Sequence, residues 1–174
     1  MVAINLNPFP KLTTTRLLLR QLRLSDTNEI FLLRGDDCVN AFIDRQKATS
    51  IDDATAFINK IIAIQNNSEG LMWAITLKND PKLIGTIGIW KIVKEKAEAE
   101  IGYELLPQYQ GNGIMLEAVK TAIKFGFETL KLKKIVAESR VDNLRSINLL
   151  GKCGFTKTDE TDGEYLIYEL SGNS

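Results

Sequence analysis

The hydrophobic positions of the chain follow two different periods, and each period predicts a type of element. In Glu98–Leu105, acidic residues and a glycine occupy the even positions and apolar residues the odd ones, which is typical of a strand with one buried face. After Gly113, apolar residues recur at helical spacing: Ile114, Ala118, Val119, Ala122, Ile123 and Phe127. This stripe predicts an amphipathic helix over residues 113 to about 130.

Apolar and β-branched runs bounded by turn residues predict further strands. They lie at residues 15–22, 71–77, 83–93, 134–139, 154–159 and 164–170. The turn Lys78-Asn79-Asp80-Pro81 joins two of these runs into an antiparallel hairpin, and Thr161-Asp162-Gly163 joins the last two.

Three more helices are predicted where a capping residue precedes an apolar stripe. One follows Ser25, one runs from Ser50 to about Gln65, and one runs from Asn143 to Lys152. No repeat or linker interrupts this order. We therefore expect one α/β domain over residues 1–174, with a mixed, largely antiparallel sheet flanked by about four helices.

Composition narrows the function classes. The 22 basic residues equal the 22 acidic ones, so no overall field favours nucleic acid or an anionic membrane. There is no histidine, and Cys38 and Cys153 lie far apart, which argues against a metal site and excludes a histidine base. No apolar run approaches the roughly 18 residues of a membrane span, and the start has no basic leader, so we expect a cytoplasmic protein.

Two glycines stand where the helix at 113 begins. A strand ends at Leu105-Leu106 and a turn follows, so the backbone N–H groups of residues 110–115 should point out of the helix N-terminus with the positive end of its dipole. Glycines at 111 and 113 let this backbone approach an anion closely. The alternative is that both are ordinary turn glycines.

Two common phosphate motifs do not match. A dinucleotide fingerprint needs a third glycine where Leu116 stands, and no Gly-Lys-Ser/Thr follows for a Walker loop. What remains is Gln108-x-x-Gly111-x-Gly113 between a strand and a helix. It resembles the pyrophosphate motif of the GCN5-related N-acetyltransferases (GNAT). The segments TTTRLLLRQLRLSD, AEIGYELLPQYQGNGIMLEAV and NLRSINLLGKCGF resemble the RimJ/RimL-type branch in the right order.

The resemblance implies a sheet of six or seven strands that is splayed between its fourth and fifth strands, here 98–105 and 134–139, with acetyl-CoA in the opening. It implies that the backbone of Leu105 and Leu106 meets the pantetheine arm and the thioester. It also implies a pyrophosphate cradle made of Gln110, Gly111, Asn112, Gly113, Ile114 and Met115. Asn143 matches an asparagine that contacts pantetheine; the alternative is that it only caps a helix.

The resemblance also suggests candidates for the catalytic residues. Many family members carry a tyrosine seven residues after this asparagine, where Leu150 stands here. Ser146 matches the residue that RimL-like enzymes are thought to use, and we expect it to donate a hydrogen bond to the departing thiolate, unless it only packs as a small residue. Glu104 and Glu100 are candidates to accept the amine proton or to position a cationic substrate; the alternative is that they are solvated surface charges.

The resemblance implies an acetyl-CoA-dependent N-acetyltransferase whose acceptor is a primary amine. We expect direct transfer, because neither cysteine lies in a motif that would activate it as a nucleophile. The resemblance points to a protein α-amino group as acceptor, such as that of a ribosomal protein. Small-molecule amines, antibiotics and amino acids remain alternatives, as does a non-catalytic acyl-CoA-binding sensor. We expect no nucleic-acid or membrane partner, and either a monomer or a homodimer.

Overall fold

A single mixed sheet organises the chain. The computed structural model describes residues 6–172, and its strands run in the order β1-β2-β3-β4-β5-β6-β8-β7. All neighbouring strands are antiparallel except β5 and β6, which are parallel. The strands are β1 Leu12–Thr13, β2 Leu17–Gln21, β3 Leu71–Leu77, β4 Asp80–Val93, β5 Glu98–Leu105, β6 Lys134–Arg140, β7 Thr156–Asp162 and β8 Tyr165–Ser171.

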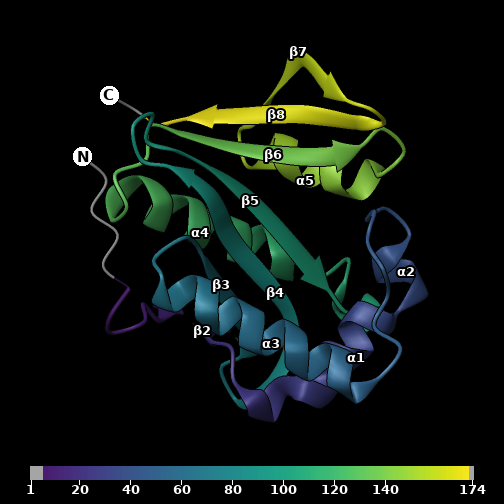
Figure 1. Cartoon of the computed structure of the whole chain (residues 1–174). Coiled ribbons are helices and arrows are strands. Elements are labelled where there is room, and N and C mark those ends of the chain that lie inside the picture. Colours follow the sequence, from purple (N-terminus) through teal and green to yellow (C-terminus); the bar gives the residue numbers. More distant parts are fainter. Residues whose placement is uncertain (1–5, 173–174) are drawn as a thin grey trace.

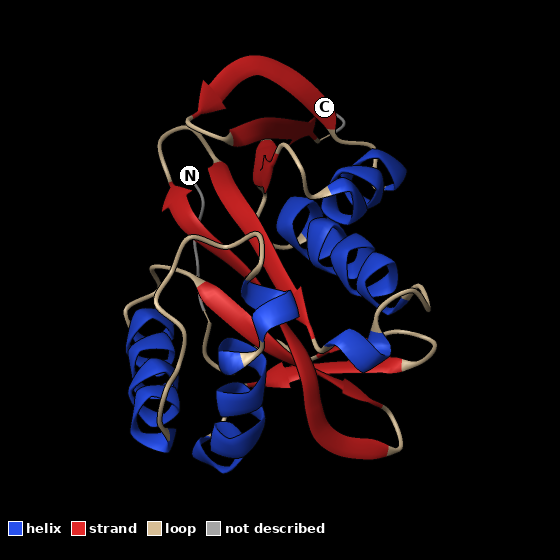
Figure 2. Ribbon diagram, turned by 90° about the vertical axis from the view of Figure 1, so that its right-hand side faces the viewer, coloured by secondary structure: helices blue, strands red, loops and turns tan. Residues whose placement is uncertain are grey.

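Helices cover both faces of this sheet (Figure 2). They are α1 Thr27–Gly35, α2 Asp37–Asn40, α3 Ile51–Asn66, α4 Ile114–Glu128 and α5 Leu144–Lys152, with 3₁₀ turns at Leu24–Asp26 and Pro107–Tyr109. Within residues 6–172, no helix has the length and apolar character that a membrane crossing requires. The α/β class and the mixed sheet predicted from the sequence are confirmed.

The alternating side chains of β3 feed two separate cores. Trp73 and Ile75 pack with α4, whereas Met72 and Ala74 pack with α1 and α3 on the opposite face. The strand is therefore buried on both sides. This explains its continuous apolar sequence, because a strand between two helical layers has no solvated face.

The sheet opens between β5 and β6. The two strands pair only at Glu98–Lys134, Ala99–Ile135 and Glu100–Val136, and then they diverge (Figure 1). Strand β6 pairs along its whole length with β8, so it leaves β5 together with β8 and β7 as one unit. The opening predicted between residues 98–105 and 134–139 is thus confirmed. It is flanked by the turn before α4 on one side and by the start of α5 on the other.

Several local predictions need correction. Ser25 lies inside the 3₁₀ turn, and the residue at the N-cap of α1 is Asp26. The Asp26 carboxylate pairs with the buried guanidinium of Arg20 at 2.7 Å and accepts the Arg23 N–H at 2.8 Å, and this draws the chain into the extra turn. The last hairpin turns after Asp162, later than predicted. The structure also adds β1 and α2, which are too short to give a periodic pattern.

Candidate active site

The glycine turn before α4 has the shape of an anion cradle. Gly111 and Gly113 both have left-handed backbones, with φ of +80° and +73°, and a Cβ added at Gly111 would meet no atom within 4 Å. The first helical donor is Glu117, whose N–H reaches the Gly113 oxygen at 3.1 Å. The preceding N–H groups of α4 thus have no intrahelical acceptor. The N–H of Gln110 was predicted to belong to the pyrophosphate cradle, but it donates to the Pro107 oxygen at 3.1 Å.

The β1–β2 hairpin holds this turn in place. The Glu117 carboxylate accepts hydrogen bonds from Thr14 Oγ1, from the Arg16 N–H at 2.8 Å and from Arg16 Nε at 2.7 Å. Arg16 also donates to the Asn112 oxygen at 2.8 Å. Burial opposes ionisation of Glu117, but the bonds from Thr14 and Arg16 outweigh it and lower the pKa of its carboxyl.

The side chain of Gln110 spans the opening between β5 and α5. Its Nε2 donates to the Leu105 oxygen at 2.9 Å, and its Oε1 accepts from Arg145 of α5 at 2.6 Å. The Leu106 N–H donates to the Ile84 oxygen at 3.0 Å. In this conformation, the Leu105 carbonyl is covered by Gln110 and the Leu106 amide is engaged within the sheet.

A second bridge crosses the opening deeper inside. The hydroxyl groups of Tyr103 on β5 and Ser146 on α5 lie 2.8 Å apart, and Asn143 Oδ1 accepts the Ser146 N–H at 3.2 Å as the cap of α5. Burial raises the pKa of Tyr103 to about 12. Asn143 therefore has the capping role that the sequence left open. Tyr103 was missed, because its place in the apolar alternation of β5 indicates only packing.

Glu104 is bound by an arginine that the sequence gave no reason to select. Arg45 donates to both carboxylate oxygens of Glu104, and the two side chains are only 14% and 15% exposed. Arg45 Nε also donates to Asn40 Oδ1 at 2.7 Å. The pair fastens the segment between α2 and α3, residues 41–50, to β5. This segment has no periodicity, so only the tertiary structure brings Arg45 to the site.

Two further carboxylates, Glu100 on β5 and Glu138 on β6, are candidates for the site. Glu100 accepts from Lys91 Nζ at 2.6 Å and from Trp90 Nε1 at 3.4 Å. The Trp90 indole covers Gly102, where a Cβ would approach its ring to 2.5 Å. Burial and the nearby charge of Glu100 raise the pKa of Glu138 on β6. Glu138 was also missed by sequence; its alternation with Lys134 and Val136 on β6 is the signal that could have found it.

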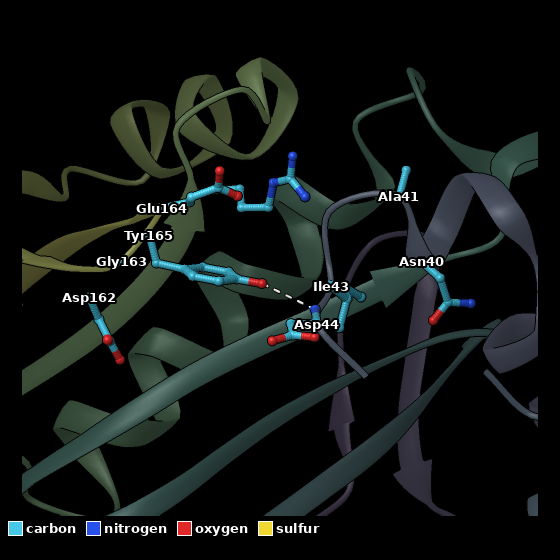
Figure 3. A pocket seen from close by; sticks show the side chains of 9 residues that line it. Asn40, Ala41, Ile43, Asp44, Asp162, Gly163, Glu164 and Tyr165 are labelled. Atoms are coloured by element: carbon cyan, nitrogen blue, oxygen red, sulfur yellow. Dashed lines mark hydrogen bonds between the residues drawn. The ribbon is translucent and has the colours of Figure 1, made fainter. Parts of the chain in front are cut away.

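A pocket of about 590 Å³ lies between the segment after α2 and the β7–β8 turn (Figure 3). Tyr165 reaches across it, and its hydroxyl accepts the Asp44 N–H at 3.1 Å. The lining is rich in carboxylates, and its one cation, Arg140, is paired with Asp142 at 2.6 Å. The lining residues are Asn40, Ala41, Ile43, Asp44, Arg140, Asp162, Gly163, Glu164 and Tyr165.

The chain is similar in sequence to known acetyltransferases over most of its length. Residues 16–156 match the family model of the acetyltransferase (GNAT) domain. The chain is 36% identical over 149 residues to the uncharacterized N-acetyltransferase YoaA of Bacillus subtilis, covering 86% of this chain and 84% of that protein. It is 25% identical over 153 residues to the spermidine N(1)-acetyltransferase of Vibrio cholerae, covering 88% and 86% of the two chains.

Solved structures agree on the fold. RimL, a ribosomal L7/L12 alpha-N-protein acetyltransferase solved with coenzyme A, superposes with a TM-score of 0.82 at 21% identity, covering 93% of this chain and 98% of that one. The family match covers most of the chain. This chain is therefore an N-acetyltransferase that belongs to the GNAT family.

Proposed function

We propose that this enzyme transfers an acetyl group from acetyl-CoA directly to a primary amine that carries further positive charge. The observation that carries the proposal is the arrangement around the opening between β5 and β6. An anion cradle lies on one side of this opening, and an acidic pocket lies on the side of the β7–β8 turn. We further propose that residues 1–174 act as one domain.

The residues beside the opening fit acetyl-CoA. The first-turn N–H groups of α4 would hold the pyrophosphate, with the Arg145 guanidinium group adding positive charge nearby. The Asn143 cap uses its oxygen, which leaves its amide hydrogens to donate to a pantetheine carbonyl. The Gln110 side chain would have to leave the Leu105 carbonyl before that carbonyl could accept from the same arm.

Transfer without an acetyl-enzyme intermediate is the simpler chemistry here. Cys153 is half-buried, and burial raises the pKa of its thiol, so the neutral form dominates near pH 7. Cys38 is exposed on α2. Neither thiol has the partner that activates a cysteine nucleophile, so we infer that the amine attacks the thioester itself.

The attacking amine must be neutral, so the site has to accept a proton. We assign this role to Glu100 and Glu138, acting through water, because Glu100 is the last β5 residue paired with β6, and burial and the charge of Glu100 raise the pKa of Glu138. Glu104 is the less suitable base, since Arg45, whose side chain is only 14% exposed, binds both its oxygens, whereas the lysine that binds Glu100 is 66% exposed. We propose that Glu104 positions residues 41–50 at the acceptor side.

The pocket lining favours a polycationic acceptor. Asp44, Asp162 and Glu164 add negative charge, and the positive charge of Arg140 is already offset by Asp142. A polyamine would pair with these carboxylates at several points, whereas a neutral N-terminal peptide would not. The similarity to a spermidine N(1)-acetyltransferase supports this choice over the protein α-amino group expected from the sequence.

The test is mass spectrometry of products from acetyl-CoA and a panel of amines: spermidine, spermine, a monoamine, and neutral and basic N-terminal peptides. We expect kcat/KM for the polyamines to exceed that for the monoamine by at least tenfold. If the preferred product is instead a monoacetylated neutral peptide, the polyamine assignment is wrong and the acceptor is a protein N-terminus.

Gly111→Asp tests the cofactor site separately. The new side chain meets open space, and aspartate tolerates the left-handed backbone of this position better than most residues, so the fold should survive at a modest cost in stability. Its carboxylate would lie at the proposed pyrophosphate position, so acetyl-CoA affinity should fall at least tenfold by calorimetry. Gly163→Asp is the matched control, because that glycine also has a positive φ, of +57°, a Cβ there also meets nothing within 4 Å, and the charge change is the same. If the two folded variants bind acetyl-CoA with equal affinity, the glycine turn is not part of the cofactor site.

A further inference from the structure

The hydrogen bond between Tyr103 and Ser146 lies where the sheet opens. Glu100 is the last residue of β5 that pairs with β6, and Tyr103 follows three residues later on the free part of the strand. Ser146 lies in the first turn of α5, which follows β6 in the chain. The 2.8 Å contact therefore joins the two sides of the opening across which the enzyme is proposed to act.

The hydrogen-bonding capacity of the pair is defined by its neighbours. The Ser146 N–H already donates to Asn143, so what the serine can offer a ligand is its hydroxyl. Tyr103 and Ser146 each carry one hydroxyl hydrogen, and only one of the two lies between their oxygens. If Tyr103 donates, the hydrogen of Ser146 remains free to point elsewhere.

We propose that Tyr103 is a positioning residue for the leaving group: it donates to Ser146 Oγ and so directs the Ser146 hydrogen to the sulfur that departs from the acetyl group. The proposal rests on the proposed function. It assigns a role to a residue on β5 that acts through a serine on α5.

Burial keeps the Tyr103 hydroxyl protonated, so it always has a hydrogen to donate. With a pKa of about 12, its hydroxyl keeps its hydrogen throughout the physiological range. An ordinary thiol has a pKa near 8.5. Transfer of the tyrosine proton to a thiolate would therefore be unfavourable by about 3.5 pKa units, or roughly 5 kcal/mol of free energy. The pair therefore stabilises the thiolate by hydrogen bonding and does not protonate it.

The step balances without an added reactant. The amine electron pair forms the C–N bond, the C–S bond breaks with its electron pair on sulfur, and the amine proton leaves through the carboxylates and water. The Ser146 hydroxyl donates to the negative sulfur while Tyr103 donates to Ser146. A donor that itself accepts a hydrogen bond is polarised and binds an anion more strongly.

The experiment measures the ionisation of bound coenzyme A by the ultraviolet absorbance of its thiolate as a function of pH. It compares wild type with Tyr103→Phe, Ser146→Ala and the double variant. Single-turnover acetyl transfer is measured in parallel. Tyr103→Phe keeps the ring and its packing, and thermal unfolding checks each variant. The control ligand is desulfo-coenzyme A, which lacks the thiol and should bind all four proteins equally.

We expect wild type to ionise bound coenzyme A at least about one pH unit below Ser146→Ala, with Tyr103→Phe in between. The single-turnover rate should fall on the order of 10²-fold for Ser146→Ala and about tenfold for Tyr103→Phe. Because Tyr103 acts through Ser146, the double variant should match Ser146→Ala.

Two results would overturn the proposal. The first is a folded Tyr103→Phe variant with wild-type thiol ionisation and transfer rate. The second is additive losses in the double variant, which would mean that Tyr103 acts independently of Ser146. The thiol titration needs no amine, so it remains decisive even if no acceptor of the panel is acetylated. A wild-type protein that fails to bind either form of coenzyme A would contradict the proposed function and this role together.

Discussion

At the scale of single residues, partners decide what a side chain can do. Glu104 and Glu98 lie on the same face of β5, and both are paired with a cation: Glu104 with Arg45 beside the opening, and Glu98 with Lys134 at 3.0 Å where the sheet is closed. The sequence alternation places both on one face but cannot distinguish their surroundings. Whether a carboxylate of β5 can take part in the reaction therefore depends on whether it lies beside the opening or where β5 and β6 are paired.

A double-mutant cycle at Glu104 tests whether it positions residues 41–50 or accepts the proton. If it positions them, Glu104→Gln and Arg45→Gln should each raise the acceptor KM by about tenfold, and the double variant should be no worse than either, since both changes break one interaction. Glu98→Gln is the matched control and should leave both kinetic constants unchanged. A loss of about 10²-fold in kcat confined to Glu104→Gln would identify Glu104 as the base instead.

At the scale of elements, the proposed cofactor cradle depends on a contact distant in sequence. The start of α4 is tied to the β1–β2 hairpin through Glu117, which accepts from Thr14 and Arg16. The helix itself is predicted by its apolar stripe, but its first turn is fixed in space by this hairpin. The cradle should therefore loosen when the tie is broken, even though α4 remains folded.

The tie should give stability a defined pH dependence. Glu117 has a lowered pKa in the folded protein, so its ionised form stabilises the fold above the ordinary value near 4.5, and this contribution is lost as the pH falls through the folded pKa. Glu117→Gln should lower the free energy of unfolding by about 1–2 kcal/mol at pH 7, with a smaller difference below about pH 4.

Urea unfolding at both pH values measures this effect. Glu128→Gln, at the exposed end of the same helix, is the control and should change stability little, because its pair with Lys124 is a solvated 4.0 Å contact. A pH-independent loss for Glu117→Gln would mean that packing, and not the ionised carboxylate, holds the hairpin to α4.

At the scale of the whole molecule, two bodies meet across the opening. The unit formed by β6, α5, β8 and β7 joins β5 through three residue pairs and the Tyr103–Ser146 bridge. It joins the turn before α4 through the Gln110–Arg145 bridge. A ligand that contacts both sides should hold them together. Its binding energy then adds directly to the stability of the fold, by about 2.7 kcal/mol at a hundredfold excess over Kd.

Hydrogen exchange should locate this effect. We expect coenzyme A to slow amide exchange on both sides of the opening, at residues 111–116 and at 143–147. The amides of β3, which are buried between two helical layers, serve as the internal reference and should change little at low ligand concentration. Protection limited to one side would show that the ligand does not bridge the two bodies.

The sequence by itself determined the longer elements and the glycine turn before α4. Periodicity in β5 and α4, the Ser50 cap, and two glycines before a helix are local features, and local sterics and hydrogen bonding are enough to express them. The position of the opening followed from resemblance to a family whose strands open at the same place. These predictions needed no knowledge of which distant residues meet.

Only the tertiary structure decided the partners. Arg45 on Glu104, Tyr103 on Ser146, and Arg145 on Gln110 join residues separated by 59, 43 and 35 positions. No periodicity links such pairs, because they are set by how the strands twist apart and where the connecting segments return. The chemistry of the site depends on these contacts, since each one determines whether a carboxylate, a hydroxyl or an amide is free to meet a substrate.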